Sequence, residues 1–231
     1  MWPLTDITVY YYGTKIQDTP KDWTFRKMVN YVSDFYHNSL NGYKPPKTAR
    51  ICIRVDDQLA KTDADYFGAI CQVYTTMDEL TYLTLDKIEQ YRYLLNLIHK
   101  SVTKTAHQFN WDITVFNTAF DRVQDSEFKF IKEYETKASR DRKNTGQAIL
   151  IKTEDRANIN IIIEGSIFKE IGLIEKKNWY WFDSSYEIAK SCKWFDKTKF
   201  GYINKKTGKF AYYSLETETL ESNIQFDDKT F

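Results

Sequence analysis

Acidic side chains at the ends of expected strands are the residues of this chain best placed to do chemistry. Four of them follow one strand: Asp56, Asp57, Asp63 and Asp65. Another strand ends in Glu135-Thr136-Lys137, the Glu-x-Lys spacing of metal-dependent nucleases. Carboxylate oxygens at strand ends can hold Mg²⁺ for hydrolysis. Since so short a pattern arises by chance in a chain with 28% charged residues, a magnesium-dependent nuclease is the third hypothesis, behind acids that merely solvate and cap loops.

A basic and aromatic segment near the C-terminus offers a second kind of chemistry. From Lys190 to Lys209 there are seven lysines and one aspartate. Lysines can meet phosphates while aromatic rings stack on unpaired bases. Single-stranded nucleic-acid binding is therefore the second hypothesis, and its candidate residues are Lys199, Lys205, Lys206 and Lys209.

The alternation in KFGYINKKTGKFAYYS (199–214) predicts a β-hairpin. A three-residue loop, Lys206-Thr207-Gly208, would place Lys205 opposite Lys209. Residues of the same parity would then share a face, with the lysines on one side and the aromatic rings on the other, namely Phe200, Tyr202, Phe210 and Tyr212. A stacking platform needs both on one surface, so this register favours rings in the core and lysines in water.

Aromatic residues are more numerous than one core ordinarily requires, with 17 Tyr, 15 Phe and 6 Trp. Tyr and Trp dominate the energetics of protein interfaces. The candidates for a protein interface are Trp179, Tyr180, Trp181 and Trp194, together with the four aspartates, which could meet a basic partner. The first hypothesis is therefore a non-enzymatic protein-binding module, for example a bacterial inhibitor of the immunity type that protects a cell from its own toxin or effector.

Other catalytic signatures are missing. The sequence contains no GxGxxG, GxxxxGK[S/T], HExxH or GxSxG motif, and its eight glycines leave few places for a phosphate-binding loop. His99 and His107 lie eight residues apart on an expected helix, about 12 Å along its axis, which is too far for joint metal ligation. We therefore expect no enzymatic activity and no cofactor or metal.

Charge and cysteine content constrain the partners and the compartment. The formal net charge is +1, so any attraction to nucleic acid must be local. Three cysteines without a CxxC pair fit a reducing compartment. No long apolar segment suggests a membrane span. We expect a cytoplasmic protein that does not bind membranes.

The hydrophobic patterns predict an α+β protein. Strands are expected at Asp6–Tyr12, Ala49–Val55 and Phe67–Tyr74. A first helix is expected to begin at Pro20, with Thr19 as its cap, and to end before Asn41-Gly42; further helices are expected from Leu85 to Phe109, with Thr84 as its cap, and from Ile113 to Val123. The helix from Leu85 to Phe109 is long and amphipathic.

The second half is expected to be an antiparallel meander that ends in the hairpin. Its other strands are Phe128–Tyr134, Ala148–Lys152, Asn158–Glu164 and Trp179–Phe182. We expect a single domain over residues 1–231, with the helices of the first half packed on a sheet that the second half completes. The connector KASRDRK permits a subdivision into a helix-rich half, 1–136, and a β-rich half, 147–231.

Overall fold

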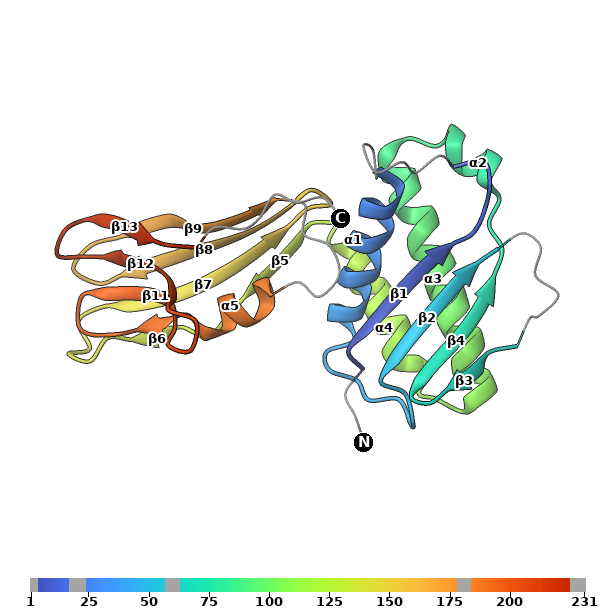
Figure 1. Ribbon diagram of the computed structural model, residues 1–231, viewed down its shortest axis with the longest axis horizontal. Coiled ribbons are helices and arrows are strands. Elements are labelled where there is room, and N and C mark those ends of the chain that lie inside the picture. The colour runs from blue at the N-terminus through green and yellow to red at the C-terminus, as the bar shows by residue number, and fades with distance from the viewer. Residues whose placement is uncertain (1–3, 17–23, 57–62, 178–183, 225–231) are drawn as a thin grey trace. The chain divides into compact units, whose positions relative to one another are not determined.

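The computed structural model describes residues 4–16, 24–56, 63–177 and 184–224. Within these ranges the chain forms five helices and thirteen strands in three sheets, which confirms the α+β class. The chain divides into two compact units, Met1–Lys129 and Phe130–Phe231, coloured blue to green and yellow-green to red in Figure 1. Every sheet lies within one unit, so the expectation of a sheet shared by the two halves is wrong. The single domain over residues 1–231, with its possible subdivision into 1–136 and 147–231, stays a prediction, and the helix start expected at Thr19-Pro20 lies outside the described residues.

The first unit contains a four-stranded, mostly parallel sheet. Its strands are β1 (Asp6–Tyr11), β2 (Arg50–Val55), β3 (Asp65–Phe67) and β4 (Ile70–Thr75), in the order β1-β2-β4-β3. β1, β2 and β4 are parallel, and β3 is antiparallel to β4. Most of the expected strand Phe67–Tyr74 forms β4, but its first part differs because Gly68 turns with φ +62° and leaves Phe67 in β3.

Helices cover one face of this sheet. They are α1 (Thr24–Ser39), α3 (Lys87–Phe109) and α4 (Ile113–Asp125), which contact one another, while α1 also contacts β1 and α3 contacts β4. Alternate β2 residues, Ile51, Ile53 and Val55, point into this core and are almost fully buried. In Figure 1 the strands lie in front, with α3 and α4 behind them.

A short helix, α2 (Glu79–Thr84), precedes the long one. Asp86, and not the expected Thr84, caps α3, because its carboxylate accepts from the Glu89 amide and Glu89 reaches back to the Asp86 amide. This reciprocal capping box satisfies two backbone donors that a helix start leaves unpaired. Thr84 instead ends α2, where its hydroxyl donates to the Thr81 carbonyl.

The second unit consists of two antiparallel sheets. One contains β5 (Phe130–Glu133), β6 (Lys137–Ala138), β7 (Thr145–Lys152), β8 (Arg156–Glu164) and β9 (Lys169–Lys177). The other contains β10 (Lys193–Trp194), β11 (Lys199–Asn204), β12 (Lys209–Ser214) and β13 (Thr219–Ser222). The buried ring of Phe200 lies against Gly146, so the inner face of the second sheet packs on the first. The helix α5 (Ser185–Ser191) contacts both sheets.

The hairpin register differs by one residue from the expected one. Asn204 pairs with Lys209, and Phe200 pairs with Tyr213, across a four-residue loop. The side chain of Asn204 accepts from the amides of Lys206 and Thr207 and so fixes the longer loop. Because a one-residue slip moves alternate side chains to the other face, Phe210 and Tyr212 lie on the same face as Lys199, away from Phe200 and Tyr202. The expected separation of rings from lysines is therefore wrong.

Candidate functional site

The face of the first sheet that points away from the helices forms a surface that we call the open face. Its residues alternate along each strand with those that face the helices: Asp6, Thr8, Tyr10, Arg50, Cys52, Arg54, Asp65, Phe67, Ile70, Gln72 and Tyr74. The register places Tyr10 beside Arg54 and Arg54 beside Tyr74. Arg54 thus lies between two tyrosines in one row across three strands.

Carboxylates accompany both arginines of the open face. Nε of Arg50 lies 2.9 Å from Asp6, and Nη2 of Arg54 lies 2.8 Å from Asp56, which follows β2. The Arg54 guanidinium also lies over the ring of Tyr12, 4.3 Å from its centre. No lysine occurs among the outward residues of these four strands as described. The open face is therefore almost neutral, and each of its two arginines already has a carboxylate partner.

Apolar and weakly polar groups complete the open face. The side chain of Phe67 is 81% exposed, and its neighbour across the strands is Ile70. Cys52 lies between Thr8 and Gln72 near the centre. Burial raises the pKa of the Cys52 thiol, and burial raises that of Cys71, on the helix side of the sheet, to about 12. Both thiols are therefore protonated at neutral pH.

The four aspartates expected from the sequence do not form a cluster in the described residues. Asp56 is paired with Arg54, and Asp65 accepts a hydrogen bond of 3.3 Å from the Tyr74 hydroxyl. Asp63 is exposed in the loop before β3, and Asp57 lies outside the described residues. Asp56 and Asp65 thus border the same face through separate partners.

Trp194 is half-buried on the inner side of the second unit's smaller sheet. Its indole nitrogen donates to the Lys137 carbonyl at 2.8 Å, and its ring lies 5.2 Å from that of Phe200. The Lys137 ammonium donates to the carbonyls of Lys190 and Cys192, at the end of α5, while Glu135 is exposed. In the described part of the chain, no three His, Cys, Asp or Glu side chains come together as metal ligands. Trp179, Tyr180 and Trp181 lie outside the described residues.

A second candidate surface lies on the outer side of the second unit's smaller sheet. We call Phe195, Lys199, Phe210 and Tyr212 the outer aromatic face. The ring of Tyr212 lies 5.5 Å from Phe210 and 6.2 Å from Phe195, and the Lys199 ammonium lies 5.3 Å from its centre. All four side chains are half-buried. Of the other lysine candidates, Lys205 and Lys206 are exposed in the hairpin loop beside these residues. Lys209 is exposed at the start of β12, where it pairs with Asn204 on the opposite face of the sheet.

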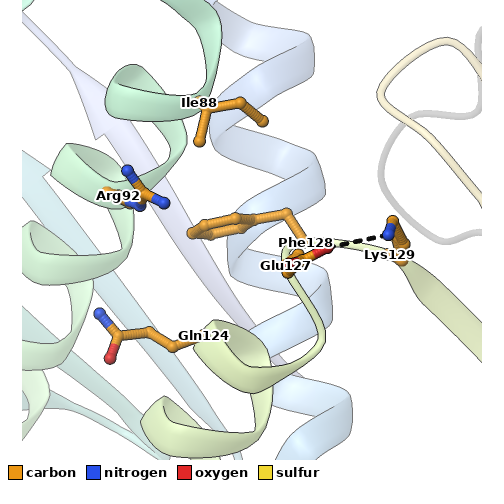
Figure 2. Close-up of a pocket in the computed structure, with 6 residues that line it drawn as sticks. All are labelled: Ile88, Arg92, Gln124, Glu127, Phe128 and Lys129. Carbon is orange, nitrogen blue, oxygen red and sulfur yellow. Dashed lines mark hydrogen bonds and ion pairs between the residues drawn. The ribbon is translucent and has the colours of Figure 1, made fainter.

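A pocket of about 520 Å³ opens beside α3 and α4 of the first unit. Figure 2 shows that Ile88, Arg92 and Gln124 line it together with the turn from Glu127 to Lys129, and the Glu127 carboxylate pairs with the Lys129 ammonium at 2.9 Å. Phe128 is buried, and its carbonyl accepts a hydrogen bond from Tyr31. Ion pairing thus occupies one side of the pocket, and its polar groups do not converge on one point.

A buried polar network holds the end of β1 beside the open face. Glu79, at the start of α2, is 2% exposed and accepts from the Tyr11 hydroxyl at 2.5 Å and from the Lys15 amide at 3.0 Å. Burial and the hydrogen bond to Glu79 raise the pKa of Tyr11 to about 12. This network fixes the chain that follows β1. Sequence reasoning missed it because Glu79 and Tyr11 are 68 residues apart.

Comparisons with known proteins add no family: no family model, no curated protein and no solved structure matches this chain. Among the described helices, none has the length and apolar character that crossing a membrane requires.

Proposed function

We propose that this chain is a non-enzymatic protein-binding module, and that its partner docks on the open face. The observation that carries the proposal is the row Tyr10, Arg54 and Tyr74 on a sheet face that none of the described helices covers. Tyr and Arg are the residues that most often dominate binding energy in protein interfaces, and lysine is depleted there. The open face has that composition.

The charge pattern supports a protein partner over a polyanion. Each arginine of the open face has a nearby aspartate, so the face offers little net positive charge to phosphates. Arginines held by carboxylates in a fixed geometry also lose little side-chain entropy when a partner covers them. The expected partner is a protein whose contact surface is nearly neutral, with apolar side chains at its centre to meet Ile70 and Phe67.

Within this class we favour an inhibitor that blocks a bacterial toxin or effector. A preformed surface on strands suits inhibition, because binding then requires little rearrangement of the inhibitor. The helix core behind β2 and the Glu79 network beside β1 supply that preformed surface.

The test is capture of a stoichiometric partner from the organism that makes the protein, with matched variants as bait. Tyr10→Ser with Tyr74→Ser removes two rings from the open face. Leu80→Ser with Leu83→Ser removes comparable apolar groups from the exposed side of α2, where the two leucines are 61% and 50% exposed. The proposal predicts that wild type and the leucine variant retain the same partner and that the tyrosine variant loses it. Retention by a folded tyrosine variant would refute the docking site.

A further inference from the structure

The outer aromatic face carries rings and cations on one surface, unlike the open face. Lys199 on β11 projects over Tyr212 on the neighbouring strand, and Phe210 and Phe195 flank that ring. We propose that this surface binds single-stranded nucleic acid, with Phe210 and Tyr212 stacking on bases and the lysines of the hairpin loop contacting phosphates. This activity is separate from the proposed protein docking and uses a different unit.

The residue paired with Tyr212 on β11 is Gly201, which has no side chain to cover the ring. Lys193, Gly201, Tyr212 and Glu221 lie in one row across four strands. Gly201 has φ +155°, and a Cβ there would lie 2.3 Å from the Ala211 carbonyl, so no side chain separates Lys193 from Tyr212. The Tyr212 hydroxyl donates to Glu221 at 2.7 Å, which fixes the ring on the sheet. A ring that is held in place loses little entropy when a base stacks on it.

In the part of the chain that the structure describes, the lysines of this region lack the carboxylate partners that the arginines of the open face have. From Lys193 to Asn223 there are six lysines and four acids. Two of the acids already have partners, since Glu218 pairs with Lys169 and Glu221 accepts from Tyr212. A third, Asp196, accepts from the amides of Thr198 and Lys199. None of the ion pairs within the described residues involves Lys205, Lys206 or Lys209.

The arrangement favours a single strand over a duplex. Stacking on a sheet needs bases that are free of a paired helix, and duplexes hide their base faces. Lys199 and the loop at Lys205 lie at opposite ends of β11, about 20 Å apart at ~3.3 Å per residue. A strand of several nucleotides can therefore span the rings while its phosphates reach both ends, within the ~4–16 nucleotides that one small β domain covers in other binders.

The experiment is fluorescence anisotropy of the full chain with labelled dT12 and U12 in 50 mM salt, and with a 12-base-pair duplex. Lys205→Glu with Lys206→Glu tests the phosphate contacts, and Phe210→Leu with Tyr212→Leu tests stacking while keeping apolar side chains. The matched control is Lys44→Glu with Lys47→Glu, which changes net charge equally through two exposed lysines of the first unit.

The proposal predicts that dT12, U12 or both bind more tightly than the duplex. Each test variant should weaken that binding by about tenfold or more, and the control by less than about twofold. The dT12 and U12 arms identify which polynucleotide is preferred. Absence of binding to both single strands, equal affinity for the duplex, or equal loss in the control would each overturn the proposal. If circular dichroism shows that the Phe210→Leu, Tyr212→Leu variant is unfolded, the variant with Lys205→Glu and Lys206→Glu alone tests the proposal. Its two lysines are exposed, so their replacement should not disturb the fold.

Discussion

The open face and the outer aromatic face are both sheet surfaces rich in aromatic rings, but they differ in how their cationic side chains are paired. On the open face, Arg50 and Arg54 each lie within 3 Å of a carboxylate. On the outer aromatic face, Lys199 lies over Tyr212, and two further lysines, Lys205 and Lys206, are exposed in the adjacent loop. Matched arginines fit a nearly neutral protein partner, whereas lysines without carboxylates fit phosphates. Aromatic content alone does not distinguish these two functions. The charged residues beside the rings, and whether they are paired, do distinguish them.

Removal of the central arginine should have the largest effect on the open face. Arg54→Ala should weaken binding of the captured protein by about thirtyfold, which corresponds to ~2 kcal/mol for a central interface residue. The same change should leave dT12 and U12 binding as in wild type. Isothermal titration calorimetry measures the first effect and anisotropy the second. Lys100→Ala, on the exposed side of α3, is the control and should change neither. Equal losses of both ligands would mean that the two faces do not act separately.

Salt should separate the two faces almost as strongly. If three lysines neutralise phosphates, oligonucleotide affinity should fall about twentyfold between 50 and 200 mM salt, from a slope near −0.7 per contact. Binding of the protein partner should change by less than about twofold, because the arginines of the open face are already paired. Titrations at four salt concentrations measure both slopes. Similar slopes for the two ligands would remove the distinction in charge.

The two faces were unequally predictable from the sequence. The alternation in ARICIRV places Arg50, Cys52 and Arg54 on one side of β2, so that half of the open face follows from period two alone. The row with Tyr10 and Tyr74 does not follow, because it depends on the parallel register of three strands that are distant in sequence. Local patterns carry no direct information on that pairing.

The hairpin shows how one residue can decide a functional interpretation. Gly208, with φ +70°, is the signal for a tight turn, and it permits loops of three or four residues. Asn204 selects the longer one through its side chain, which accepts from two loop amides. The side chain of Asn204 is therefore the sequence feature that indicates a four-residue loop. A three-residue loop leaves that feature out of account and places Phe210 and Tyr212 on the wrong side of the sheet.

Alkaline pH should lower the free energy of unfolding of the first unit. The size of this decrease tests whether the hydrogen bond between Tyr11 and Glu79 stabilises the end of β1 beside the open face. The pKa of Tyr11 is raised above its unfolded value of 10 to about 12, so its contribution to stability is complete below pH 10 and disappears as pH rises through 12. After allowance for solvent screening at this half-buried phenol, the loss is about 1–2 kcal/mol. Urea unfolding at pH 8 and pH 11 measures about half of this loss, because pH 11 lies midway between the two pKa values. Tyr11→Phe should lower stability at pH 8 and reduce the pH dependence; a variant with the full dependence would contradict the assignment.

The smallest expected effect is a difference in the alkylation rates of the cysteines. The rate at Cys52 reports directly on whether a ligand covers the open face. At pH 8, half-buried Cys52 should react several times faster than Cys71 or Cys192, because burial raises the pKa of each of the latter two thiols to about 12. Bound protein partner should slow the reaction of Cys52 severalfold, and dT12 should not. Mass spectrometry of iodoacetamide adducts over time provides the rates. Protection of Cys52 by the oligonucleotide would show that it reaches the open face.

Photo-crosslinking in an extract of the native organism tests the central claim most directly. In one sample, a photoreactive phenylalanine analogue replaces Gln72 at the centre of the open face. In another, it replaces Ile203, the residue of β11 that pairs with Phe210 of β12. The account predicts protein adducts that resist nuclease from position 72, and adducts that nuclease shortens from position 203. Nuclease-sensitive adducts from position 72, or the same protein adduct from both positions, would contradict the assignment of two surfaces to two kinds of partner.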